Sequence, residues 1–279
     1  MKYSKKIWIT GCLLFISVMI TGCSSGIRID LGDSSWAKDV IAHQERKTAK
    51  DEFTFDEISS KEVDIEINMG KIVIRSGEDD QVKIDVRYEA QSEDEETLTE
   101  ILDTVTIVCE DKKGNLKIAA VNKETNEDIW NWIRDRYHKD YRIDPTLEVS
   151  LTITLPKSIS EFHIDNAMGG IQLSSVSGEF YINNDMGQVE LENVQFAGES
   201  DITVAMGDLR CSLAKDLEES AEVNLEVDMG NISIDTNGFS YITDEKDDDN
   251  FMGASSTVTI QELCKIRTEV AMGKVSVRK

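Results

Sequence analysis

The chain has 279 residues and carries 54 acidic residues against 30 lysines and arginines, which gives a formal net charge of −24. A charge of this sign and size disfavours nonspecific binding to nucleic acid and to anionic lipid surfaces, and it leaves basic partners and divalent cations as candidates. Five cysteines are too few for a disulfide scaffold, and the length allows one substantial domain with a hydrophobic core.

The N-terminus has the pattern of an export signal. Three lysines precede an apolar run from Ile7 to Ile20, which ends in Ile-Thr-Gly-Cys at Cys23. This ending resembles the lipobox of bacterial lipoproteins, which implies cleavage after residue 22 and attachment of diacylglycerol, with palmitate as a typical acyl chain, to Cys23. An earlier Thr-Gly-Cys at Cys12 lies too deep in the apolar run. The alternative is an uncleaved anchor, but the run is shorter than the roughly 20 residues of a spanning helix.

We therefore predict a signal peptide over 1–22 and an extracytoplasmic protein that is lipid-anchored to the bacterial cell membrane. Residues 23–51 are predicted to form a polar tether, with a short helix around Trp36–His43. Removal of residues 1–22 takes away three lysines and no acids, so 27 basic residues against 54 acidic ones leave a charge of −27. Strand patterns begin near Phe53, and we expect residues 52–279 to form one β-strand repeat domain.

An insertion at about 91–145 interrupts the strand pattern. Residues 92–104 change to a helical period, with Ser92 as a candidate cap and Leu98, Ile101 and Leu102 on one face. Two further alternating runs predict strands, and a segment rich in basic and aromatic residues follows them. We expect a small helical or irregular insertion.

The basic-aromatic segment is the candidate partner-binding site. Its residues are Trp130, Trp132, Arg134, Arg136, Tyr137 and Tyr141. Side chains of these types stack on sugars and anchor protein partners. The alternative is that they cover the open end of a stacked fold, because exposed strand edges need protection.

A repeated Met-Gly motif predicts the fold. Runs of alternating apolar residues close on Met-Gly and resume after it, at Met69, Met168, Met186, Met206, Met229 and Met272. Each copy predicts a strand, a corner and a second strand, and stacked coils of this kind bury a continuous core. Apolar residues lie four and two positions before most of the methionines, which predicts methionine in the interior and glycine at the corner. The interval before the last copy equals two coils if Met252 marks a degenerate one.

The pattern as a whole predicts an all-β chain, a β-solenoid of stacked parallel strand repeats. The segment LEVSLTITLPKSISEFHIDNAMGGIQLSSVSGEFYINNDMGQVEL resembles a bacterial family of adhesin-like domains of unknown function that are built from β-strand repeats. The resemblance covers roughly residues 53–279. It implies a solenoid-like β domain, often exported or membrane-tethered and in some cases associated with envelope-stress systems. It implies no catalytic residues, and the methionine before glycine departs from the small polar residue common in that family.

Three features suggest ligands, and each has a structural alternative that we favour. Stacked methionines would form either a thioether column suited to Cu(I) or a hydrophobic ladder. Asn166 and Asn184, two residues before methionine, would form an internal amide ladder or contact a sugar at the surface. The Asp-rich run 244–250 would collect Ca²⁺ or form a solvated loop. Cys211 and Cys264 follow the apolar pattern and are expected to be buried.

No catalytic or metal-binding motif is evident in the sequence. The acidic residues Glu190, Glu192, Asp208 and Glu226 invite comparison with β-helical enzymes that cleave polysaccharides. However, a chain with 54 acids brings some together by chance, and the three histidines are scattered without zinc spacing. We therefore predict no enzyme activity, no cofactor and no metal.

The predicted function is that of a lipid-anchored cell-envelope surface protein that acts as a non-catalytic binding or adhesion module. An envelope glycan or a protein is the expected partner, and nucleic acid is not. The alternatives are an accessory component of envelope-stress signalling and, less favoured, a carbohydrate-active β-helix enzyme.

Overall fold

The computed structural model describes residues 45–56, 58–137, 145–215, 220–246, 254–260 and 264–279. The chain divides into two compact units, Met1–His43 and Gln44–Lys279, and everything described belongs to the second. Among the described residues, no helix is both long enough and apolar enough to cross a membrane. The predicted signal peptide, the lipidated Cys23 and the helix around Trp36–His43 lie outside the described residues.

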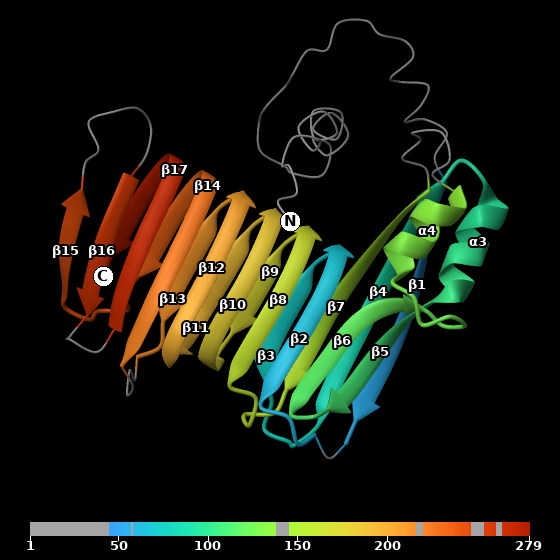
Figure 1. Ribbon diagram of the computed structural model, residues 1–279, viewed down its shortest axis with the longest axis horizontal. Helices are drawn as coiled ribbons and strands as arrows, with labels where there is room; N and C mark the ends of the chain where they lie inside the picture. The colour runs from blue at the N-terminus through green and yellow to red at the C-terminus, as the bar shows by residue number, and fades with distance from the viewer. Residues whose placement is uncertain (1–44, 57, 138–144, 216–219, 247–253, 261–263) are drawn as a thin grey trace, which may run out of the picture. The chain divides into compact units, whose positions relative to one another are not determined.

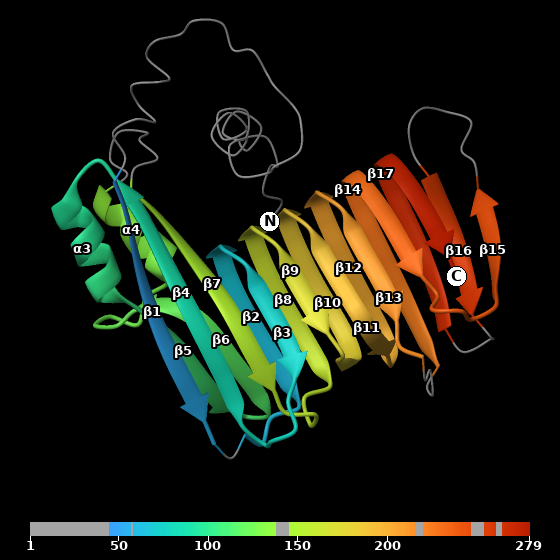
Figure 2. The same cartoon turned by 180° about the vertical axis from the view of Figure 1, so that it is seen from behind.

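Most of the second unit consists of β-strands in two layers (Figures 1 and 2). In spatial order, the first layer contains β5 (Val105–Lys112), β6 (Asn115–Asn122), β2 (Glu62–Met69), β8 (Glu161–Met168), β10 (Ser177–Met186), β12 (Gly198–Met206), the first half of β14 (Ala221–Asp235), the first half of β17 (Cys264–Arg278), β16 (Ala254–Ile260) and β15 (Tyr241–Lys246). Neighbouring strands from β6 to β17 are parallel. The end strands β5, β16 and β15 are antiparallel to their neighbours.

The second layer follows the same axis. It contains, in order, β1 (Glu45–Phe55), β4 (Val82–Ser92), β7 (Thr146–Leu155), β3 (Ile72–Ser76), β9 (Ile171–Ser174), β11 (Val189–Phe196), β13 (Leu209–Leu213) and the second halves of β14 and β17. The strands β1, β4 and β7 are antiparallel to one another, and the remaining neighbours are parallel. A coil is therefore one strand from each layer joined at a Met-Gly corner.

The order of coils in space differs from their order in the chain. The coil β2–β3 comes first in sequence, but β2 lies between β6 and β8, and β3 lies between β7 and β9. The chain runs from β3 through β4, α3 (Glu95–Thr104), β5, β6, α4 (Ile129–Tyr137) and β7 before it continues into β8. Both helices lie at the end formed by these strands, and β15 and β16 form the other end (Figure 1).

The predicted helix over 92–104 is confirmed as α3, with a different cap. The carboxylate of Asp94 accepts a hydrogen bond from the backbone N–H of Thr97 at 2.8 Å, so Asp94 and not Ser92 is the N-cap. Leu98 and Ile101 are buried as expected. The segment 91–145 is only partly an insertion, because β6 joins the first layer beside β2.

The core lies between the two layers and is formed by the inward side chains of both. Alternate residues of the parallel first-layer strands are almost fully buried, and Ile65 in β2 has no exposed surface. Phe162 and Phe180 of neighbouring coils stack with ring centroids 5.1 Å apart. Phe196, in the second strand of the Phe180 coil, meets the Phe180 ring edge-on with centroids 5.4 Å apart. Each buried side chain of this size contributes about 1.5–3 kcal/mol through the removal of apolar surface from water. Cys211 and Cys264 are buried, as predicted.

The methionines of the repeat do not occupy the interior. They stand opposite one another in neighbouring coils, but all are at least partly exposed, and Met229 and Met272 are 37% and 44% exposed. The prediction of inward methionines is therefore wrong. It assumed strict alternation of sides, whereas the glycine that follows each methionine has a positive φ, +150° at Gly207, and the chain turns there from one layer into the next.

Two further boundaries differ from the sequence prediction. Residues 45–51, expected as the end of the tether, form the first part of β1, which pairs with β4 along its whole length. No extra coil precedes Met272, because β14 and β17 pair directly, Met229 opposite Met272. The strands β15 and β16 continue the first layer beyond β17 instead. Met252 itself lies outside the described residues.

The predicted fold class is confirmed. Apart from two short helices, the described part of the chain is mainly β-strand, and its parallel coils form a solenoid-like stack.

Candidate functional site

The outward side of the first layer carries polar side chains in straight rows. Neighbouring strands from β2 to β17 are parallel and in register, so equivalent residues of successive repeats stand side by side, about 4.8 Å apart. Three rows are outward-facing, and each is named by its distance before the methionine of the repeat. Seven positions before it stand Glu62, Glu161, Glu179, Glu199, Glu222 and Lys265. Five positions before it stand Asp64, His163, Tyr181, Asp201, Asn224 and Arg267, and three positions before it stand Glu66, Asp165, Asn183, Thr203, Glu226 and Glu269. We call these three rows the acidic face.

The outward side of the second layer is close to neutral by comparison. One of its rows is Thr152, Val73, Gln172, Glu190, Arg210, Ser233 and Ser276. In this row the single carboxylate, Glu190, stands beside Arg210, and further along the side Asp235 forms an ion pair with Arg278 at 3.2 Å. The carboxylates of the repeat are thus concentrated on one side of the stack.

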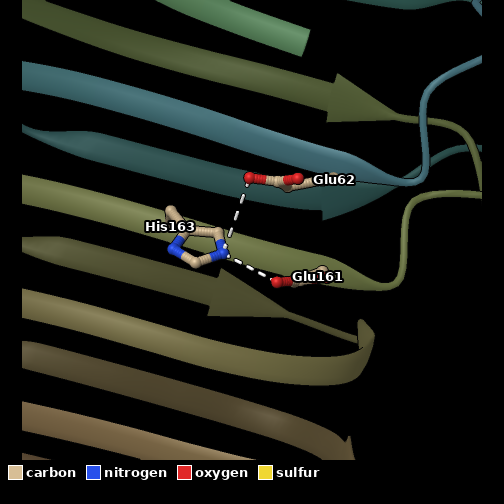
Figure 3. Close-up of side chains that lie close together, drawn as sticks. All are labelled: Glu62, Glu161 and His163. Carbon is tan, nitrogen blue, oxygen red and sulfur yellow. Dashed lines mark hydrogen bonds and ion pairs between the residues drawn. The ribbon is translucent and has the colours of Figure 1, made fainter. Parts of the chain in front are cut away.

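A histidine and two carboxylates meet at one place on the acidic face (Figure 3). Glu62 of β2 and Glu161 of β8 are opposite each other in register, and His163 lies two residues beyond Glu161 on the same side of the strand. The Nε2 atom of His163 is 2.9 Å from Oε1 of Glu161 and 3.7 Å from Oε1 of Glu62. One nitrogen therefore faces both carboxylates.

Neighbouring strands hold these three side chains in place. The Nδ2 group of Asn115 in β6 donates a hydrogen bond to Oε1 of Glu62 at 3.0 Å. The ring of Tyr181 in β10 stacks on the His163 ring with centroids 4.8 Å apart and planes 17° apart. The Tyr181 hydroxyl donates to Glu179 at 3.1 Å. The cluster itself lies on β2 and β8, and the strands on either side of these two, β6 and β10, contribute the supporting contacts.

One carboxylate of the acidic face, that of Glu226, has a raised pKa. Burial raises the pKa of Glu226, and the nearby charges of Glu269, Asp228 and Asp201 raise it further. The pKa of Tyr181 is also raised, first by burial and then by its hydrogen bond to Glu179 and by the surrounding glutamates. The negative charges around Glu226 and Tyr181 therefore favour a bound cation near these two side chains.

The basic-aromatic segment forms contacts within the fold. The indole N–H of Trp130 donates to the carbonyl oxygen of Leu147 at 3.0 Å. Arg136 forms an ion pair with Glu100 of α3, and its guanidinium lies 5.6 Å from the ring centroids of both Trp132 and Tyr137.

The remaining members of that segment contribute less. The Tyr137 hydroxyl donates to Glu100 at 2.7 Å, which links α4 to α3 a second time. Arg134 is exposed and pairs only with its neighbour Asp135 among the described contacts. Tyr141 lies outside the described residues. This arrangement favours the capping alternative for the part of the segment that is described.

Asn166 and Asn184 stand opposite each other in the core, 2% and 0% exposed. Their burial excludes contact with a surface sugar and agrees with the internal position we favoured. Asn166 donates to the carbonyl oxygen of Gly70 at 3.1 Å, across to the neighbouring coil. The bond that joins the coils here runs from side chain to backbone.

The acidic residues considered for catalysis are not brought together. Glu190 and Glu192 project from β11 in the second layer, and Glu226 projects from β14 on the acidic face. Asp208 lies at a corner, where its carboxylate accepts two hydrogen bonds from Asn231 at 3.0 Å. The first part of the Asp-rich run, residues 244–246, is not the expected loop but the second half of β15, where Asp244 is exposed. Residues 247–250 lie outside the described residues.

Two hollows on the described surface are small. One of about 240 Å³ is lined by Leu155, Pro156 and Phe162 among others, and one of about 260 Å³ lies beside Glu66 and Lys117. Both are below the roughly 300–1,000 Å³ of typical small-molecule sites. The long polar rows of the acidic face are therefore the more extensive feature.

Sequence reasoning missed the cluster, although a signal was present. The repeats place Glu62 and Glu161 at the same position, seven residues before methionine, so stacking alone makes them neighbours. The sequence Glu161-Phe162-His163 then puts the histidine on the same side as both glutamates. Alignment of the repeats against one another would have found the site.

These features define a class of protein, a two-layer β-solenoid with one acidic outward side. The chain belongs to the Toastrack DUF4097 family, whose model matches residues 102–261, more than half of the chain. No curated protein matches the sequence.

Solved structures that match this chain have low sequence identity to it and low TM-scores. One, titled a "putative cell adhesion protein", from Clostridium sporogenes, is 11% identical with a TM-score of 0.39, and the match covers 83% of this chain and 99% of that one. A "putative adhesin" from Bacteroides fragilis is 10% identical with a TM-score of 0.29 and coverages of 83% and 97%. A third, from Parabacteroides merdae, is 12% identical with a TM-score of 0.24 and coverages of 84% and 97%.

Proposed function

We propose that the protein is a lipid-anchored, non-catalytic binding module of the cell envelope and that the acidic face holds its partner. One observation carries this proposal. The parallel strands of both layers stack in register. Carboxylates nevertheless dominate the outward side of the first layer, whereas on the second layer they are few and are balanced by basic side chains. Stacking alone would not produce this difference, because both layers stack equally well.

The chemistry of the acidic face favours a basic protein segment as the partner. Rows of carboxylates at the strand spacing attract lysine and arginine side chains over a long contact, and complementary charge speeds association. The parallel ladders hold the rows rigidly, which lowers the entropy lost on binding. An acidic face of this kind disfavours nucleic acid. A glycan partner is the competing outcome of the test below.

Site-specific photo-crosslinking in intact cells tests the binding role. A crosslinking residue at Thr203 probes the acidic face, and one at Arg210 probes the outward side of the second layer as a matched control. We expect a discrete protein adduct from Thr203 that is absent from Arg210. Equal adducts from both positions, or adducts that a glycosidase removes, would overturn the proposal.

The anchor part of the proposal rests on the sequence. The apolar run before Ile-Thr-Gly-Cys has signal-peptide length, and two acyl chains on a cysteine give stable membrane attachment where one chain does not. We expect Cys23→Ser to abolish incorporation of a palmitate analogue and to release the protein from the membrane fraction. Cys12→Ser, the matched control in the earlier Thr-Gly-Cys, should leave both unchanged. Loss of labelling in Cys12→Ser but not in Cys23→Ser would contradict the assignment of the anchor.

Two observations support the absence of catalysis. The acids that invite a glycosidase mechanism project from different layers, so Glu190 and Glu226 cannot flank one bond in the way a glycosidase pair does. The two hollows described above, of about 240 and 260 Å³, are also smaller than substrate pockets usually are.

A further inference from the structure

We propose that Glu62, Glu161 and His163 form a binding site for a divalent transition-metal ion of the Zn²⁺ class. The proposal goes beyond the binding role of the acidic face and does not depend on it. It rests on the position of three ligand atoms, on their chemical types and on the side chains that fix them.

The three ligand atoms already have the spacing of a coordination shell. The Nε2 atom of His163 and one carboxylate oxygen of each glutamate all lie within 4.8 Å of one another. Ligands about 2.1 Å from a tetrahedral ion are about 3.4 Å apart. The distances of 2.9 Å and 3.7 Å from Nε2 to the two glutamates lie on either side of that value, so small side-chain rotations suffice.

The donor set selects the class of ion. An imidazole nitrogen with two carboxylates suits Zn²⁺ and its first-row neighbours, whereas Ca²⁺ and Mg²⁺ prefer oxygen ligands alone. Three protein ligands leave one position open to water, and the three side chains are between 35% and 41% exposed. An ion can therefore reach the site from solvent without opening the fold.

The surrounding side chains orient the ligands. Asn115 donates to Oε1 of Glu62, which fixes that carboxylate, and the stacked ring of Tyr181 limits rotation of the His163 ring. Outer contacts of this kind typically change metal affinity 10–100-fold. The two glutamates also repel each other across the register, and a bound cation between them relieves that repulsion.

The glutamate row provides a control within the same surface. Glu199 occupies the same position of a later repeat, but the residue two positions on is Asp201 rather than histidine. Scattered binding of cations by the acidic face would involve Glu199 as much as Glu161. A site of the proposed kind involves only the repeats around His163.

Titration calorimetry of the purified full chain with ZnCl₂ at physiological salt tests the site. We expect one tight equivalent, at least about 10-fold weaker binding in His163→Gln and in Glu161→Gln, and a change below about 3-fold in Glu199→Gln. Excess Ca²⁺ should not displace the zinc. A Co²⁺ titration followed by visible absorption should show d–d bands that His163→Gln removes.

Two results would overturn the proposal. The first is zinc binding that is unchanged in His163→Gln, and the second is zinc binding that Ca²⁺ and Glu199→Gln reduce as much as His163→Gln does. Circular dichroism of each variant checks the fold, and we expect no change because all three substituted side chains lie on the surface.

Discussion

Gly207 stacks directly on Gly187 of the preceding coil: a methyl group placed on Gly207 would lie 1.8 Å from the carbonyl oxygen of Gly187. The same close approach recurs from coil to coil between successive corner glycines. The ladder of backbone hydrogen bonds continues through the corner. The N–H of Gly187 donates to the carbonyl oxygen of Met206, and the N–H of Gly207 donates to the carbonyl oxygen of Met229, each at 2.9 Å. The close approach of the coils at this edge therefore requires a residue without Cβ.

Substitution of a corner glycine should destabilise the fold strongly. At Gly207, alanine meets both a φ of +150° and the backbone of the preceding coil, so we expect Gly207→Ala to cost about 3–5 kcal/mol. Gly238→Ala is the matched control, because Gly238 has a φ of +92° but nothing within 4 Å of the added methyl, and about 1–2 kcal/mol is expected there. Urea denaturation measures both. Equal losses would show that φ alone, not stacking, requires the glycine.

The exposed methionines should contribute little to stability. Met229 is 37% exposed and Leu225, four residues earlier in the same strand, is fully buried. We expect Met229→Gln to change the free energy of unfolding by less than about 0.5 kcal/mol and Leu225→Ala to lower it by about 2–5 kcal/mol. A large loss of unfolding free energy in Met229→Gln would show that the methionine packs in the core after all.

The sequence predicted the repeat, the strand–corner–strand unit and the parallel stacking, because period-two alternation and recurrent Met-Gly pairs are local signals. It failed at Met229 and its equivalents, because alternation was extended through a residue that precedes a glycine of positive φ. The position of the β2–β3 coil, with β2 between β6 and β8 and β3 between β7 and β9, could not be predicted either. Only pairing with β6 and β8 fixes it, and nothing local in residues 62–76 encodes those partners.

The candidate metal cluster could be predicted from the sequence only by aligning the repeats in the register in which their strands stack. Glu62 and Glu161 are 99 positions apart, and a search for zinc spacing along the chain does not join them. The repeat alignment joins them at once, and His163 follows from strand parity. The contact of Asn115 with Glu62 was beyond sequence reasoning, because it depends on the placement of β6 beside β2.

The contact between α4 and α3 predicts a structural role for Tyr137. Tyr137→Phe removes the hydrogen bond to Glu100, and we expect a loss of about 1 kcal/mol in thermal or urea unfolding. Arg134→Gln, which alters an exposed side chain of the same helix, should change stability by less than about 0.5 kcal/mol. Unchanged stability in Tyr137→Phe together with lost crosslinked partners would instead favour partner binding by this segment.

The carboxylate of Asp111 should make part of the stability depend on pH. Its pKa is lowered, first by a hydrogen bond from the Ser60 hydroxyl at 2.5 Å and then by the backbone N–H of Ser59 at 2.8 Å. A carboxyl group whose folded pKa is depressed stabilises the fold fully above its unfolded pKa, about 4, and loses that contribution as the pH falls through the folded value. Because Asp111 is exposed, solvent screens its charge, and we expect Asp111→Asn to cost only about 1 kcal/mol at pH 7.

The difference in unfolding free energy between Asp111→Asn and the unaltered protein should therefore shrink below about pH 4. Glu124→Gln serves as the control, because it removes an exposed carboxylate that has no side-chain hydrogen bond among the described contacts. Its effect should stay below about 0.5 kcal/mol at pH 7. Urea titrations at pH 7, 5 and 3 measure the three proteins together, and a difference for Asp111→Asn that is constant with pH would show that its charge does not stabilise the loop at Ser59 and Ser60.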